Sequence, residues 1–210
     1  MAFFTRYFKK LSFLLLLGVA TFAFAAESSI QIKHAELQPQ DEYYNLNADV
    51  EISLDDEIEE AINKGVPLNF LIEFQIVSPR KYWFDDEIVT TSRSVTLSYH
   101  ALSRLYLVNR GAHQKSFETL SEARQELAQI KDWRVLDKAQ VEKGGNYKAA
   151  LLFRLDQSKL PKAIQVDTIS SEKWNLSSEK FEWGLKELNN KELNNKELNS
   201  KEPISKELKP

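Results

Sequence analysis

Apolar and polar residues alternate with a period of two along several stretches of the chain, which is typical of β-strands with one buried and one solvated face. In the clearest stretch, residues 44–54, the apolar face is formed by Tyr44, Leu46, Ala48, Val50, Ile52 and Leu54. Comparable patterns predict strands over residues 70–77, 94–99, 105–108 and 147–155, with a first strand starting at 30–32 and a weaker late strand at 165–167.

Two short helices are predicted between these strands. Residues 55–64 begin with acidic side chains, whose charge suits a helix N-terminus, and end at Gly65. A second helix is predicted over about residues 120–130, where Thr119 and Glu122 have the spacing of a capping box. Strands in series with few helices indicate either a β-sandwich or a curved sheet with flanking helices. Of these we expect the sandwich: a mainly β (α+β), antiparallel β-sandwich-like domain with two short helices.

The N-terminal segment has the features of a secretory signal peptide. Basic residues precede an apolar run over residues 11–24, and Ala23 and Ala25 are the small residues that a signal peptidase accepts. The run is shorter than the ~20 residues that a membrane-spanning helix needs. We therefore expect residues 1–25 to be cleaved and the protein to be periplasmic. An uncleaved segment, which would tether the same domain at the inner membrane, is the alternative.

The C-terminal segment repeats a five-residue unit that begins with Lys-Glu. Five copies occupy residues 186–210. A step of five residues turns an α-helix by about 500°, so the leucines of successive copies form no apolar stripe. The segment offers too little apolar surface to bury, and we predict that it is disordered. The remaining residues, 26–185, are expected to form a single β-rich domain that is long enough to bury a core.

Composition and charge exclude several classes of function. The chain contains no cysteine, which excludes disulfides, thiol nucleophiles and zinc–thiolate sites. Without the charges of the N-terminal segment and the tail, 19 basic and 26 acidic residues remain, a net charge of about −7. An acidic body lacks the clustered cations that bind nucleic acid and is not attracted to anionic membranes. We expect no nucleic-acid partner, and membrane contact only through an uncleaved N-terminus.

No catalytic, cofactor or metal motif stands out from the background of chance matches. His34, His100 and His113 are scattered, with no pair at metal-ligand spacing. Several Ser-x-x-Lys matches lack the Lys-Thr-Gly partner of penicillin-recognising enzymes, and the six glycines form no phosphate-binding loop. We therefore predict no catalytic residue, no metal site and no cofactor, and a non-enzymatic protein.

One segment combines aromatic and cationic residues directly after a predicted strand. One interpretation is an aromatic lid on the end of the sandwich, with Arg80 stacked on a ring. The other is a recognition surface, because aromatic and arginine side chains dominate the hot spots of protein interfaces. The candidate binding residues are Arg80, Lys81, Tyr82, Trp83 and Phe84.

Five segments together resemble one protein family. They are PRKYWFD at 79–85, LSYHALSR at 97–104, SFETL at 116–120, LDQSKLPK at 155–162 and SEKWNLSS at 171–178. With them the body, about residues 30–183, resembles the DUF4390 family, although His100 departs from the asparagine usual there. The resemblance implies an exported protein of Gram-negative bacteria whose function is unknown. Genes of this family often lie beside a membrane sensor kinase and its response regulator, which implies an accessory of an envelope signalling system.

Three hypotheses about function follow. The first is a non-enzymatic domain that binds a protein partner in the cell envelope through residues 80–84. The second is a cell-envelope protein that holds a small apolar or carboxylate ligand between its sheets, in a pocket lined by aromatic residues. The third and least favoured is an envelope hydrolase, which needs Ser, Asp or Glu side chains converging in a cleft.

Overall fold

A computed structural model describes residues 28–142, 144–168 and 172–185. The predicted signal peptide at 1–25 and the predicted disordered tail at 186–210 lie outside the described residues. The described strands and α-helices are, in chain order, β1 (Ser29–Pro39), β2 (Tyr43–Ser53), α2 (Asp56–Asn63), β3 (Leu68–Ser78), β4 (Asp86–His100), β5 (Leu105–Arg110), β6 (His113–Phe117), α3 (Leu120–Leu127), β7 (Gln129–Asp137), β8 (Lys148–Leu155), α4 (Lys162–Thr168) and β9 (Phe181–Gly184).

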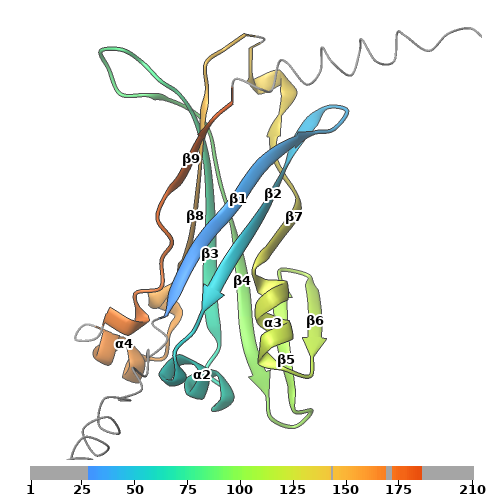
Figure 1. Cartoon of the computed structure of the whole chain (residues 1–210), viewed down its shortest axis with the longest axis vertical. Coiled ribbons are helices and arrows are strands. Elements are labelled where there is room, and N and C mark those ends of the chain that lie inside the picture. The colour runs from blue at the N-terminus through green and yellow to red at the C-terminus, as the bar shows by residue number, and fades with distance from the viewer. Residues whose placement is uncertain (1–27, 143, 169–171, 186–210) are drawn as a thin grey trace, which may run out of the picture.

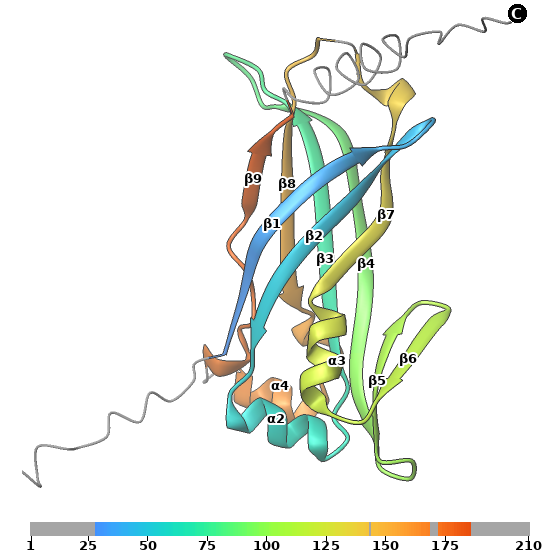
Figure 2. The same ribbon diagram turned by 45° about the vertical axis from the view of Figure 1, so that its right-hand side comes forward.

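The strands form two antiparallel sheets that pack face to face (Figure 1). The smaller sheet has the strand order β1-β2-β7, and the larger has the order β6-β5-β4-β3-β8-β9. In both views of the ribbon, β1 and β2 run obliquely across the face of the larger sheet (Figures 1 and 2). The predicted antiparallel β-sandwich is therefore confirmed.

The core lies between the sheets, on the apolar faces that the alternating pattern predicted. Along β2, Val50 is buried and its neighbour Glu51 is exposed, and the apolar face from Tyr44 to Ile52 is buried throughout, although Asn45 on the other face is buried as well. Phe74 of β3 is fully buried; its ring centroid lies 6.5 Å from that of Trp133 on β7 and 6.1 Å from that of Trp183 on β9. Because β7 belongs to the opposite sheet, Phe74 joins the two layers. Burying each such ring stabilises the fold by about 2–3 kcal/mol.

Strand β4 is much longer than the strand predicted over residues 94–99. It spans 15 residues, and its first half pairs with β3 as far as Ser78 and Asp86. No side chain of residues 86–94 is fully buried, so the first half shows no apolar alternation to detect. The connection between β3 and β4 extends past the end of the sandwich in both views (Figures 1 and 2).

The two predicted helices are present. Helix α2 follows Asp55, whose carboxylate accepts a hydrogen bond from a backbone N–H of the first turn. Helix α3 begins with the predicted capping box, but it ends at Leu127 rather than at residue 130. It ends early because the carbonyl of Ala128 accepts a hydrogen bond from the N–H of Val50 (3.0 Å), and the residues that follow pair with β2.

The late strand predicted over residues 165–167 is wrong, because these residues belong to helix α4. Local hydrogen bonds favour the helix: the carbonyl of Pro161 accepts the N–H groups of Ile164 and Gln165. The described part of the chain thus carries three short α-helices instead of two. None of the helices within the described ranges has the length and apolar content to cross a bilayer.

Candidate functional site

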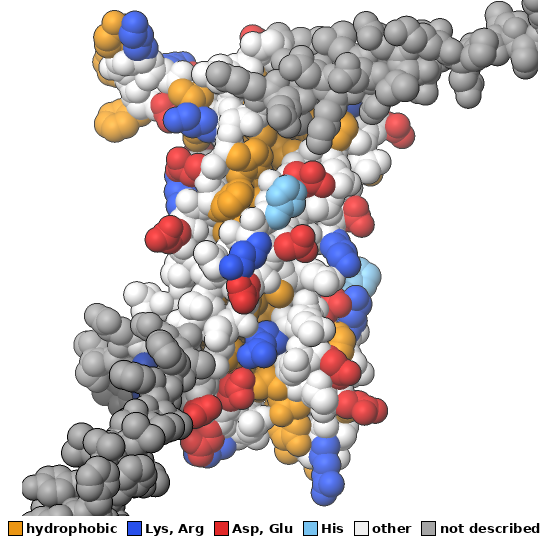
Figure 3. Space-filling view, in the orientation of Figure 1, with side chains coloured by type: hydrophobic (Ala, Val, Ile, Leu, Met, Phe, Trp, Pro, Cys, Tyr) orange, Lys and Arg blue, Asp and Glu red, His pale blue; other side chains and the backbone are white. Residues whose placement is uncertain are grey.

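The five candidate binding residues lie together in the loop that joins β3 to β4, and all five are exposed. The exposed fraction is 83% for Tyr82, 79% for Trp83 and 94% for Phe84. Among the described residues, Leu102 is the one other large hydrophobic side chain exposed to this degree. In the space-filling view the loop projects from the body with hydrophobic and basic side chains together (Figure 3). We call residues 80–84 the aromatic tip.

The aromatic tip does not form a lid over the end of the sandwich, as one interpretation of the sequence proposed. Its rings point into solvent, and Arg80 is not stacked on a ring but forms an ion pair with Asp86. The backbone N–H of Arg80 also donates a hydrogen bond to the Asp85 carboxylate (3.2 Å). These contacts join the two ends of the loop.

A change of register bends the hairpin just below the aromatic tip. The pairing between β3 and β4 shifts between Ile76 and Val77, so that Ile76 faces Val89 and Val77 faces Glu87. An extra residue in one strand increases the local twist and redirects the chain. The bulge therefore turns the aromatic tip away from the direction of the sheet.

A cavity of about 310 Å³ lies beside the aromatic tip, with lining residues from β3, β4, β8 and β9. Its lining carries both signs of charge, and Phe84 connects it to the aromatic tip. The lining residues are Gln75, Val77, Phe84, Asp85, Glu87, Lys148, Ala149, Ala150, Lys180 and Glu182. The exposed rings and this cavity thus form one continuous surface.

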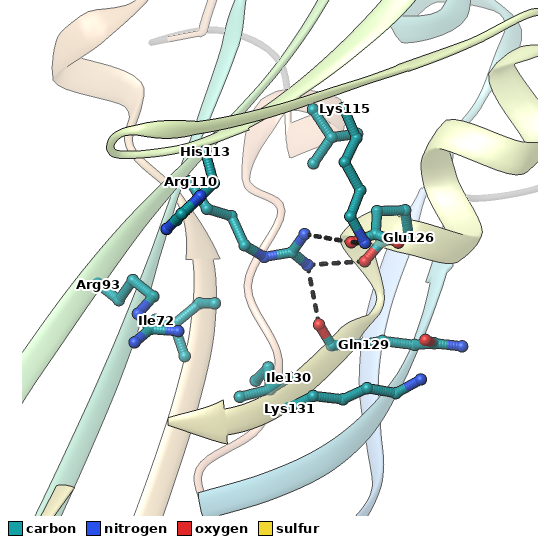
Figure 4. A pocket seen from close by; sticks show the side chains of 10 residues that line it. Ile72, Arg93, Arg110, His113, Lys115, Glu126, Gln129, Ile130 and Lys131 are labelled. Carbon is teal, nitrogen blue, oxygen red and sulfur yellow. Dashed lines mark hydrogen bonds and ion pairs between the residues drawn. The ribbon is translucent and has the colours of Figure 1, made fainter. Parts of the chain in front are cut away.

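A second cavity, of about 220 Å³, lies where β4, β5 and β6 of the larger sheet face β7 and the end of α3 (Figure 4). Its lining holds four Arg or Lys side chains and one carboxylate, that of Glu126. The lining residues are Ile72, Arg93, Val108, Arg110, His113, Lys115, Glu126, Gln129, Ile130 and Lys131. We call it the cationic cavity. The net charge of its lining is positive, whereas the net charge of the domain is negative.

Arg110 is held firmly in the wall of the cationic cavity (Figure 4). Its guanidinium donates to the Glu126 carboxylate (2.9 Å) and to the backbone carbonyls of Glu126 (2.7 Å) and Gln129 (2.8 Å). Burial lowers the pKa of Arg110, and the adjacent carboxylate of Glu126 opposes this effect. The same carboxylate oxygen of Glu126 also accepts Lys115 (2.9 Å), so one anion is shared by two cations.

Arg93 differs from Arg110 because its guanidinium has no hydrogen-bond or ion-pair partner among the described residues. It lies over the ring of Trp133, 5.0 Å from the centroid. Burial lowers its pKa, and the positive charge of Arg110 lowers it further. Its five N–H donors are therefore free, in a place where the nearby charge is of the same sign.

The described residues hold no group of three or more His, Asp and Glu side chains that could bind a metal ion. Neither cavity is the aromatic-lined pocket that the small-ligand hypothesis required, since Phe84 is the one aromatic residue in the two linings. The cationic cavity was not predictable from the sequence, because its charged residues come from four different elements: Arg93, Arg110, Glu126 and Lys131. No short motif connects them.

Comparison with known proteins identifies the family. No curated protein matches the chain, and no solved structure matches it either. The family model of DUF4390, a domain of unknown function, matches residues 27–184 and thus covers the described strands and helices. This match confirms the resemblance seen in the sequence: the chain belongs to the DUF4390 family.

Proposed function

We propose that this protein is an exported, non-enzymatic binding domain that docks on a protein partner through the aromatic tip. The observation that carries the proposal is the exposure of three consecutive aromatic side chains, Tyr82, Trp83 and Phe84, at the end of a hairpin. Exposed apolar patches mark interaction sites, and aromatic side chains dominate interface hot spots. The signal-like pattern of residues 1–25 supports a cell-envelope protein as the partner.

The aromatic tip alone would bind weakly. Three aromatic side chains present about 500 Å² of surface, which at ~25 cal/mol per Å² contributes roughly 12 kcal/mol when fully buried. Losing translational and rotational freedom costs about 4–15 kcal/mol, which offsets most of this gain. The neighbouring cavity that includes Phe84 adds the mixed-charge surface from which a polar rim is built. The expected interface therefore comprises both features.

The charges around the aromatic tip favour a protein partner over a lipid bilayer. Arg80 and Lys81 are followed by Asp85, Asp86 and Glu87, so the loop and its neck carry one more negative charge than positive. Arg80 is also occupied by its ion pair with Asp86. Anionic lipids attract clusters of free Lys and Arg, which this loop lacks. A protein groove with apolar pockets and a mixed-charge rim fits the loop better.

A crosslinking experiment tests the proposal. We would place a photo-reactive phenylalanine analogue at Trp83 and, as a matched control, at Leu102, which is exposed to 93% in the turn between β4 and β5. That turn lies at the opposite end of β4 from the aromatic tip (Figure 1). The expected result is one protein that crosslinks at Trp83 and not at Leu102. Purified partner should then bind the Tyr82→Ala/Trp83→Ala/Phe84→Ala variant at least ~30-fold more weakly, as for hot-spot residues.

The variant should fold normally, because removing exposed side chains changes the free energy of unfolding by roughly 0.5 kcal/mol or less per site. Identical crosslinking at Trp83 and Leu102 would contradict the proposal, and so would equal affinity of the wild type and the triple variant. Binding to lipid vesicles that depends on the three rings, without a protein crosslink, would replace the protein partner with a bilayer surface.

A further inference from the structure

We propose that the cationic cavity binds a small oxyanion with several charged oxygens, of the phosphate or polycarboxylate class, and that Arg93 is its main contact. This inference is independent of the aromatic tip, because the lining residues of the cationic cavity belong to β3 through β7 and α3 and include no residue of the loop.

The cationic cavity contains free hydrogen-bond donors. Arg93 lines the cavity with five N–H groups, and none of them has a partner among the described residues. Its guanidinium carbon lies 5.0 Å from the centroid of the Trp133 ring. A planar guanidinium with free donors is suited to two parallel hydrogen bonds with a carboxylate or phosphate group.

The lining of the cavity has an excess of positive charge. Arg93, Arg110, Lys115 and Lys131 line the cavity, and Glu126 is the one carboxylate in the lining. Glu126 is already bound by Arg110 and Lys115. The charges of Arg93 and Lys131 therefore have no ion-pair partner among the described residues. A bound anion would supply the missing negative charge and relieve the repulsion between Arg93 and Arg110.

The size of the cavity limits the ligand. Its volume of about 220 Å³ is below the ~300–1,000 Å³ of sites for drug-sized molecules. The buried apolar wall of Ile72, Val108 and Ile130 offers no hydrogen bonds, so the polar contacts come from the cationic side. A compact anion with little carbon surface fits this arrangement.

Isothermal titration of the purified protein at low salt tests the inference. The probes are pyrophosphate for the phosphate class, citrate for the polycarboxylate class, and myo-inositol as a neutral polyol. We expect saturable one-to-one binding of at least one anion and none of myo-inositol. Arg93→Gln should weaken binding at least ~tenfold, which corresponds to about 1.4 kcal/mol. The anion that binds with the higher affinity identifies the ligand class.

Arg134→Gln is the matched control. Arg134 also lies over an aromatic ring, 4.6 Å from the centroid of Tyr43, but it lies outside the cationic cavity. It should weaken binding less than ~twofold, since only long-range charge is lost. If Arg93→Gln fails to fold, Arg93→Lys is the variant to test, because it keeps the positive charge. It should still weaken binding several-fold, because lysine lacks the planar pair of donors. Absence of saturable binding to both anions, or equal weakening by the changes at Arg93 and Arg134, would overturn the inference.

Discussion

Replacing Arg110 with methionine tests whether this side chain holds α3 and β7 together. Methionine keeps most of the apolar stem of the side chain and removes the charge and the donors. In the native protein these donors bind the carboxylate of Glu126 and the carbonyls of Glu126 and Gln129, at the C-terminal end of α3. The change removes three hydrogen bonds that join β5 to the end of α3 and the start of β7.

The expected loss of stability follows from how buried this ion pair is. The side chains of Arg110 and Glu126 are 20% and 21% exposed, so about four-fifths of each is buried. Removing one partner of a fully buried pair costs about 3–5 kcal/mol. Lys115 remains bound to Glu126 and reduces the loss. We expect the free energy of unfolding to fall by about 2–3 kcal/mol, which lowers Tm by roughly 5–10 °C for a domain of this size.

Urea denaturation followed by circular dichroism measures this loss, with Arg134→Met as the control. Arg134 forms an ion pair with Asp137 in which the side chains are 60% and 52% exposed, and its loss should cost at most ~0.5 kcal/mol. In the double variant Arg110→Met/Glu126→Leu, part of the stability should return, because no carboxylate is left short of a partner. Equal losses of stability at Arg110 and Arg134 would show that the contacts of Arg110 do not stabilise the junction of α3 and β7.

Three further predictions concern the caps, the core and acid stability. Thr119→Ala removes half of the capping box of α3 and should cost about 1 kcal/mol in urea denaturation, against no change for Ser121→Ala on the same helix. Phe74→Ala removes the ring between the sheets and should cost about 3–5 kcal/mol with loss of near-ultraviolet dichroism; an unchanged aromatic spectrum would contradict its place in the core. The hydrogen bond from Lys173 lowers the pKa of Glu57 below its ordinary value of 4.5. Its contribution to stability is therefore present above pH 4.5 and is lost as the pH falls through the lowered pKa, so wild type and Glu57→Gln should converge in acid; a constant difference between them would contradict this assignment.

The regular alternation of residues made most of the sandwich predictable. β2, β3 and β8 each have one consistently buried face, and a period of two in the sequence is a direct result of that burial. The ends of α2 and the start of α3 were predictable because capping depends on residues adjacent in sequence. Local physics was sufficient for these elements.

Strand β7 could not be predicted from the sequence, because irregular pairing breaks its pattern. Its register with β2 shifts twice, and Asp132 adopts a positive φ of 49°. Buried and exposed residues consequently do not alternate along the strand. The strands β6 and β9 were also missed, since they are short and lie at the two edges of the larger sheet. Pairing with distant segments, not local pattern, defines all three strands.

Of the two candidate sites, one could be predicted from the sequence and the other could not. The aromatic tip was predictable because its five residues are contiguous and follow a strand, although their exposure was not. The cationic cavity required the tertiary structure, since Arg93 and Lys131 line one cavity only after β4 and β7 are placed in opposite sheets. The sequence around a single arginine in a strand does not show which distant residues lie next to it in the fold.

The position of β7 in the smaller sheet has a consequence for the order in which the chain folds. β2 pairs on one side with β1, which precedes it directly, and on the other side with β7, where Leu46 faces Trp133. The hairpin of β1 and β2 is therefore expected to form early, while the other edge of β2 stays unpaired until β7 docks. During that interval the backbone N–H and C=O groups along this edge can pair with strands of other unfolded chains. Because loop closure over such a distance is slow, docking of β7 is expected to limit the folding rate.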